Sequence, residues 1–244
     1  MSDKSSLIIN VKETIRFFDE KPCYSSKQAT SIVGVVGEDL AASCFQHYLE
    51  SHQCAKVTIY DNPVTTGKKK GPRLDRWIAV DWPDGRRIVF QTEIKNSSAH
   101  ATEGKTLPVS ATSEEVAVYK QKLWEKKWNT QHRTLEDNND AKVLVPMEPP
   151  LHLKREEVLP LILYWIAIGT PDQVNSHLFC IPNPACGFPL GRPPNWPIHI
   201  ENFPELWVFS VSSYLRSLPN DSIILHMPIA AHRLRILGKL FKTP

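Results

Sequence analysis

Three residues on two neighbouring segments, Asp75, Glu93 and Lys95, have side chains that together could carry out metal-dependent hydrolysis. Two carboxylates close to one another would hold Mg²⁺ or Mn²⁺, because these ions bind hard oxygen ligands, and Mg²⁺ keeps waters that a phosphate can displace. The metal would polarise a scissile phosphate and lower the pKa of a bound water. Lys95 would orient the nucleophile and offset charge that develops in the transition state. The backbone carbonyl of Ile94, between Glu93 and Lys95, is a further candidate ligand.

Residues 71–98 are expected to form a β-hairpin that carries this set. Its arms are residues 73–82 and 86–96, and Pro83-Asp84-Gly85 between them contains the Asp-Gly pair typical of hairpin turns. The second arm alternates, with one face made of Ile88, Phe90, Thr92 and Ile94 and the other of Val89, Gln91, Glu93 and Lys95. Glu93 and Lys95 are therefore neighbours on one face, with Gln91 as a supporting residue. The alternative is that these charges form cross-strand ion pairs at a solvated edge.

A helix is predicted over residues 34–51, where apolar residues recur every four positions as Val36, Leu40, Cys44 and Tyr48. At 100° per residue, Glu38 falls on the edge of this apolar stripe. It is a candidate fourth site residue that would hold the metal through water or bind a second ion. The alternative is that Glu38 only stabilises the first helical turn through the helix dipole.

The segment 65–73 contains four positive charges and no negative one, on Lys68, Lys69, Lys70 and Arg73. A basic run is often a solvated loop, but this one leads directly into Asp75. It is therefore predicted to contact the phosphates of a nucleic acid.

The order of these features resembles the PD-(D/E)XK nucleases, the restriction-endonuclease-like superfamily. A helix is followed by Pro72-Arg73-Leu74-Asp75 and then by Glu93-Ile94-Lys95 on the next strand, and Glu38 matches the helical glutamate that many members place before the first motif. The first motif departs from the family pattern in the spacing of Pro72 from Asp75. The resemblance covers residues 34–98 and implies an α/β core with a mixed sheet flanked by helices, Mg²⁺ dependence and hydrolysis of DNA phosphodiester bonds.

The 244 residues, 41% hydrophobic and 23% charged, are expected to form a single domain. The predicted fold is α/β, with a mixed central sheet in a catalytic core over residues 30–181 and a peripheral C-terminal portion over residues 182–244. A helix is expected over 113–135. The apolar run 161–168 (LILYWIAI) suits a central strand, and residues 177–181 are predicted to be its hairpin partner.

Several other classes of protein are disfavoured. The five cysteines are scattered without a CxxC pair, which disfavours a structural zinc site and favours a reducing compartment. The chain has no HExxH or GxSxG motif and no Gly-rich GxxxxGK[ST] phosphate loop. Its N-terminus lacks the layout of a signal peptide, and the longest apolar run, residues 158–169, is too short to span a bilayer. A cytoplasmic protein without a membrane partner is expected.

The function expected from the sequence is a Mg²⁺-dependent DNA endonuclease of restriction or anti-phage defence. A homodimer would suit the cutting of both strands, and the sequence leaves open whether an activating subunit takes part. One alternative is a repair or recombination nuclease of the same fold that acts on branched or single-stranded DNA. Another is a nucleic-acid-binding module that kept the fold and lost activity.

Overall fold

The fold is described from a computed structural model. The described residues are 5–20, 26–61, 74–98, 112, 114–115, 118, 143, 146–154, 156–166, 177–182 and 203–240. Only Glu114, Glu115 and Val118 of the helix predicted at 113–135 are among them, and these three are helical. The rest of that prediction lies outside the described residues.

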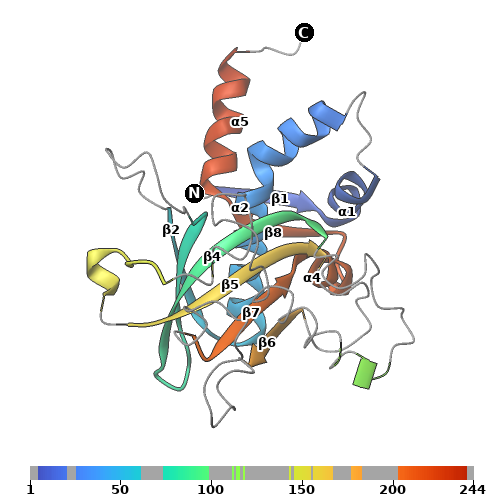
Figure 1. The fold of residues 1–244 in the computed structure, drawn as a ribbon. Coiled ribbons are helices and arrows are strands. Elements are labelled where there is room, and N and C mark those ends of the chain that lie inside the picture. The colour runs from blue at the N-terminus through green and yellow to red at the C-terminus, as the bar shows by residue number, and fades with distance from the viewer. Residues whose placement is uncertain are drawn as a thin grey trace.

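A six-stranded mixed sheet is the centre of the molecule (Figure 1), with the strand order β2-β3-β4-β5-β7-β6. The strands are β2 (Lys56–Asp61), β3 (Arg76–Asp81), β4 (Arg87–Ser98), β5 (Glu157–Ile166), β6 (Leu178–Pro182) and β7 (Glu205–Ser210). The strands β2, β3 and β4 pair antiparallel, β4, β5 and β7 pair parallel, and β6 returns antiparallel to β7. The chain is thus an α/β protein with a mixed central sheet.

One face of this sheet is covered by the long helix α2 (Ser26–His52), which contains the helix predicted at 34–51. Phe45 of α2 is fully buried, and its ring meets the rings of Phe90 and Phe209 edge to face at centroid distances of 6.0 and 5.4 Å. Burial of one such side chain contributes about 1.5–3 kcal/mol. The apolar stripe read from the sequence is therefore the face that fixes α2 to the sheet.

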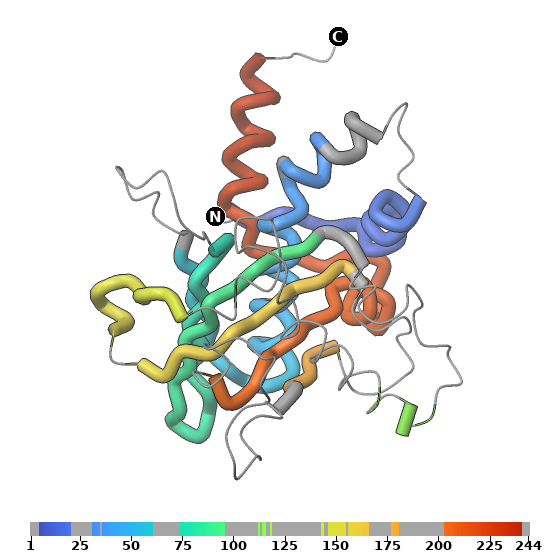
Figure 2. Tube along the Cα trace, in the orientation of Figure 1, coloured from blue at the N-terminus to red at the C-terminus, as the bar shows by residue number. Residues whose placement is uncertain are grey.

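Six further elements complete the described part of the fold. They are β1 (Ser6–Asn10), α1 (Val11–Glu20), a short 3₁₀ helix (Leu151–Leu153), α4 (Val211–Ser217), β8 (Ser222–His226) and α5 (Pro228–Leu240). The strands β1 and β8 form a separate antiparallel pair, which brings segments from the two ends of the chain side by side (Figure 2). The buried Asp39 of α2 accepts a hydrogen bond from the Ala230 N–H in the first turn of α5, at 2.8 Å. This carboxylate satisfies one of the unpaired N–H groups of that helix end.

The predicted hairpin is confirmed as β3 and β4. The Gly85 N–H donates to the Trp82 carbonyl at 3.0 Å, and Gly85 has a φ of 86°, in the left-handed region that glycine adopts without strain. The predicted alternation also holds: Ile88, Phe90 and Ile94 belong to the core that includes α2. Glu93 and Lys95 therefore lie on the face of the sheet that points away from α2.

Two predictions for the second half of the chain need correction. Residues 161–166 of the predicted run are confirmed as part of a central strand, β5, and residues 167–168 lie outside the described residues. Residues 177–181 do not pair with β5, because β7 lies between β5 and β6. For the same reason the portion 182–244 is not wholly peripheral. Leu206, Val208 and Phe209 of β7 are fully buried, so this strand is stabilised inside the sheet rather than at its margin. None of the described helices is long and apolar enough to cross a membrane.

Candidate functional site

Asp75 lies beside the segment of β4 that contains Glu93, where β3 begins. The last register pair of the hairpin at this end is Arg76 with Thr92, and Asp75 directly precedes Arg76 in the chain. The Oδ2 atom of Asp75 accepts a hydrogen bond from the Ile94 N–H at 2.7 Å, and the Asp75 N–H donates to the Thr92 carbonyl at 3.1 Å. The main chain of β4 thus fixes both the backbone and the carboxylate of Asp75.

The Ile94 carbonyl faces the same side of β4 as Asp75. In antiparallel strands the residues of a hydrogen-bonded pair exchange both bonds, so the N–H and C=O of one residue point to the same neighbour. Because the Ile94 N–H is bonded to Asp75, its carbonyl is directed to that edge as well. This orientation fits the predicted role of Ile94 as a backbone ligand beside the two carboxylates.

Glu93 and Lys95 form an ion pair at the end of β4. The Lys95 Nζ and Glu93 Oε1 atoms are 2.7 Å apart, with Glu93 only 1% exposed and Lys95 23% exposed. A buried carboxylate needs a nearby positive charge to offset the loss of its hydration. Lys95 supplies that charge while its own side chain reaches the surface.

Glu38 lies on the other side of the sheet from this ion pair. Arg76 shares a face of β3 with the core residues Ile78 and Val80, and this face packs on α2. Glu38 meets Arg76 there, with Oε2 and Nη1 3.5 Å apart. The same Nη1 atom donates to the Asp75 carbonyl at 2.7 Å. Glu38 is therefore joined to the site through Arg76, a residue that the sequence reasoning missed although it directly follows Asp75.

Gln91 supports the site from the face that carries Glu93. It is fully buried, its Oε1 atom accepts from the Met147 N–H at 3.2 Å, and its Nε2 atom donates to the Val143 carbonyl. Both ends of the amide are therefore used to hold the main chain of Val143 and of Met147 against β4. The predicted phosphate contacts Lys68, Lys69, Lys70 and Arg73 lie outside the described residues.

The donor atoms fit a hard divalent cation. Asp75 and Glu93 offer carboxylate oxygens and Ile94 a carbonyl oxygen, the ligand types that Mg²⁺ and Mn²⁺ prefer. In the part of the chain that is described, no group of three or more His, Cys, Asp or Glu side chains is placed to hold a metal. An ion held by two carboxylates would keep much of its hydration, as Mg²⁺ does.

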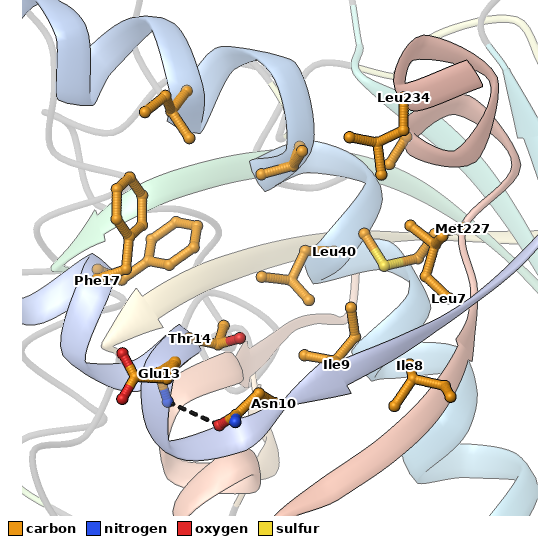
Figure 3. A pocket seen from close by; sticks show the side chains of 14 residues that line it. Leu7, Ile8, Ile9, Asn10, Glu13, Thr14, Phe17, Leu40, Met227 and Leu234 are labelled. Atoms are coloured by element: carbon orange, nitrogen blue, oxygen red, sulfur yellow. Dashed lines mark hydrogen bonds between the residues drawn. The ribbon is translucent and has the colours of Figure 1, made fainter. Parts of the chain in front are cut away.

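A pocket of about 360 Å³ lies elsewhere, between β1, α1, α2 and α5 (Figure 3). Its lining is mostly apolar and includes Leu7, Ile9, Phe17, Leu40, Met227 and Leu234. At its rim the Glu13 N–H donates to the Asn10 side-chain oxygen at 3.0 Å, which caps α1. Among the described lining residues Glu13 is the charged one, and Asn10 and Thr14 are the uncharged polar ones.

No family model, curated protein or solved structure matches this chain. The function is therefore inferred from the residues and their geometry.

Proposed function

We propose that this chain is a Mg²⁺-dependent endonuclease of the PD-(D/E)XK type that hydrolyses phosphodiester bonds in DNA, in restriction or anti-phage defence. The observation that carries the proposal is that Asp75 is hydrogen-bonded to both chain neighbours of Glu93, Thr92 and Ile94, while the Lys95 ammonium lies 2.7 Å from Glu93. A mixed sheet with α2 on one face is also the kind of core that the sequence resemblance implies, which supports the same proposal.

Asp75, Glu93 and the Ile94 carbonyl would hold the ion. When bound, Mg²⁺ supplies Lewis-acid polarisation of the scissile phosphate and makes a neighbouring water more acidic. The Ile94 N–H holds the Oδ2 atom of Asp75, which leaves Oδ1 as the oxygen that turns toward the cation. Glu93 is buried, and a buried carboxylate attracts a cation more strongly than an exposed one because the local dielectric constant is lower.

Lys95 would change partner during the reaction. Without a metal its ammonium neutralises Glu93, as the 2.7 Å contact shows. With a divalent cation held at Glu93, Lys95 would no longer be needed to neutralise this carboxylate, and its partly exposed ammonium would be free to turn to the phosphate. There it orients the attacking water and offsets the negative charge that develops in the transition state.

Nicking of supercoiled plasmid tests the proposal. Wild-type protein is expected to nick the plasmid with Mg²⁺ and not with EDTA, whereas Asp75→Asn, Glu93→Gln and Lys95→Ala each lower the rate at least about 100-fold, as loss of a transition-state contact does. The matched controls are Lys12→Ala and Asp221→Asn, which remove the two halves of an exposed Lys–Asp ion pair. Both controls are expected to cut like the wild type.

Three outcomes would overturn parts of the proposal. Metal-dependent nicking that survives Lys95→Ala removes Lys95 from the mechanism. Cleavage restricted to branched or single-stranded DNA favours a repair or recombination nuclease. DNA binding without cleavage under Mg²⁺ or Mn²⁺ indicates a binding module and rejects the enzyme.

A further inference from the structure

We infer that Arg76 is a positioning residue of this site, which links Glu38 on α2 to the main chain of Asp75 and thereby sets the affinity for the divalent cation. The inference rests on the proposed function, because it takes Asp75 to be a metal ligand. It assigns a role to an arginine that the sequence motifs do not include.

The geometry of Arg76 is that of a bridge between a strand and a helix. It is the first residue of β3, and its side chain is only 12% exposed. Its Nη1 atom lies 2.7 Å from the Asp75 carbonyl oxygen and 3.5 Å from Glu38 Oε2. A guanidinium suits this position because its planar set of donors can hold two acceptors at once in a fixed arrangement.

Asp75 needs such support because it lies just beyond the regular pairing of the sheet. The register pairs of β3 with β2 and with β4 both stop at Arg76. The Asp75 N–H and carboxylate are held by β4, and its carbonyl is held by Arg76. Without the guanidinium, the peptide after Asp75 gains rotational freedom, and its carboxylate is less well aligned for a metal. Residues that orient metal ligands in this way typically change metal affinity 10- to 100-fold when they are replaced.

The direction in which metal affinity changes when Arg76 is replaced tests the inference, because the positive charge of Arg76 and its positioning role have opposite effects on that affinity. Charge alone would repel a cation, so removal of the guanidinium would then strengthen metal binding. Positioning predicts the opposite, weaker binding. A merely structural surface pair with the 45% exposed Glu38 predicts no change, since such pairs contribute little.

Calorimetric titration with Mn²⁺ and with Mg²⁺, without DNA, separates these cases. Arg76→Met is expected to weaken Mn²⁺ binding about 10- to 100-fold, and Arg76→Lys is expected to weaken it less because the charge and part of the reach remain. In a double-mutant cycle, Glu38→Gln and Arg76→Met are expected to be less than additive, because they act through one contact.

Arg87→Met is the matched control. Arg87 also pairs with a carboxylate, Asp81, at 3.3 Å, but at the opposite end of the β3–β4 pairing. Its loss is expected to leave Mn²⁺ binding unchanged. Circular dichroism establishes that each variant is folded, and if Arg76→Met is not, Arg76→Lys and Glu38→Gln carry the test.

The failure of this inference can be told apart from failure of the proposed function. If the wild type neither binds Mn²⁺ or Mg²⁺ nor nicks plasmid, the proposed function is rejected and the inference with it. If the wild type binds and cuts while the Arg76 variants bind the metal as well as or better than it, only the role of Arg76 is rejected.

Discussion

The ion pair of Glu93 and Lys95 has one role in the stability of the fold and another in the proposed reaction. A carboxylate that is 1% exposed is costly to bury, and the ammonium 2.7 Å away offsets that cost. The same two groups are those that would hold a cation and face a phosphate. Lys95 therefore supplies the positive charge that this buried carboxylate needs.

Removal of Lys95 should therefore destabilise the metal-free protein more than removal of an exposed lysine. Lys95→Ala is expected to lower the free energy of unfolding by about 2 kcal/mol, somewhat below the 3–5 kcal/mol typical of breaking a fully buried pair, because Lys95 is partly exposed. Lys12→Ala, whose pair with Asp221 is exposed, should cost less than about 1 kcal/mol. Urea unfolding in EDTA measures both values, and equal costs for the two variants would contradict the structural role of Lys95.

At the scale of elements, two glycines with open surroundings are expected to respond in opposite directions to alanine. A Cβ atom at Gly85 or at Gly34 would meet nothing within 4 Å, so only the backbone decides. Gly85 has a φ of 86° in the hairpin turn, and Gly85→Ala should cost about 1–2 kcal/mol. Gly34 lies within α2, and Gly34→Ala should stabilise the protein by about 0.5–1 kcal/mol. Urea unfolding of both variants tests this, and a stabilising Gly85→Ala would show that the turn does not need a left-handed residue.

The elements that sequence could predict are those with a local signal. Apolar residues at every fourth position predicted the helix at 34–51, which lies within α2. The Asp-Gly pair and the alternation of the second arm predicted the hairpin and placed Glu93 and Lys95 on one face. Register then follows from the turn, which explains why Asp75 lies beside residues 92–94 of β4. The role of Asp39 was missed because its partner, Ala230, is far away in the sequence.

The order of the strands was harder to predict for the same reason. Consecutive strands are usually neighbours, which led to the pairing of β5 with the strand that follows it. In the structure β7 takes that place, and its sequence alone does not specify which neighbour it will have. The role of Arg76 was missed for another reason. Arg76 directly follows a predicted site residue, but its contact with Glu38 depends on the packing of α2 on the sheet, which the sequence does not show.

At the scale of the whole molecule, a polar cluster joins three parts of the chain on the α2 side of the sheet. His47 of α2 is hydrogen-bonded through Nδ1 to the Tyr214 hydroxyl of α4. His177, which precedes β6, is bonded through Nδ1 to the Ser213 hydroxyl at 3.1 Å. Burial lowers the pKa of His47 and of His177, and the charge of the nearby His52 lowers the pKa of each further. The contacts between these elements therefore favour the neutral form of both histidines.

This cluster predicts a loss of stability in mild acid. In the unfolded chain a histidine has a pKa near 6.5, and in the fold the pKa of His47 and of His177 is lower. Well above pH 6.5 both states are neutral and the two histidines contribute no pH dependence. As the pH falls through that value, the unfolded chain takes up protons first, so the free energy of unfolding declines until the pH drops below the folded-state pKa values.

A comparison of two proteins isolates this effect from that of the carboxylates. Urea unfolding of the wild type and of the His47→Gln/His177→Gln variant is measured from about pH 7.5 to about pH 5, a range that spans the histidine titration. For each protein, the quantity compared is the fall in the free energy of unfolding from the upper to the lower pH. This fall is expected to be smaller in the variant, because it lacks the two groups that protonate preferentially in the unfolded chain. Equal falls in the two proteins would mean that both histidines accept protons in the fold as readily as in the unfolded chain. The contacts of α2 and of the segment before β6 with α4 would then not depend on the neutral form of these histidines.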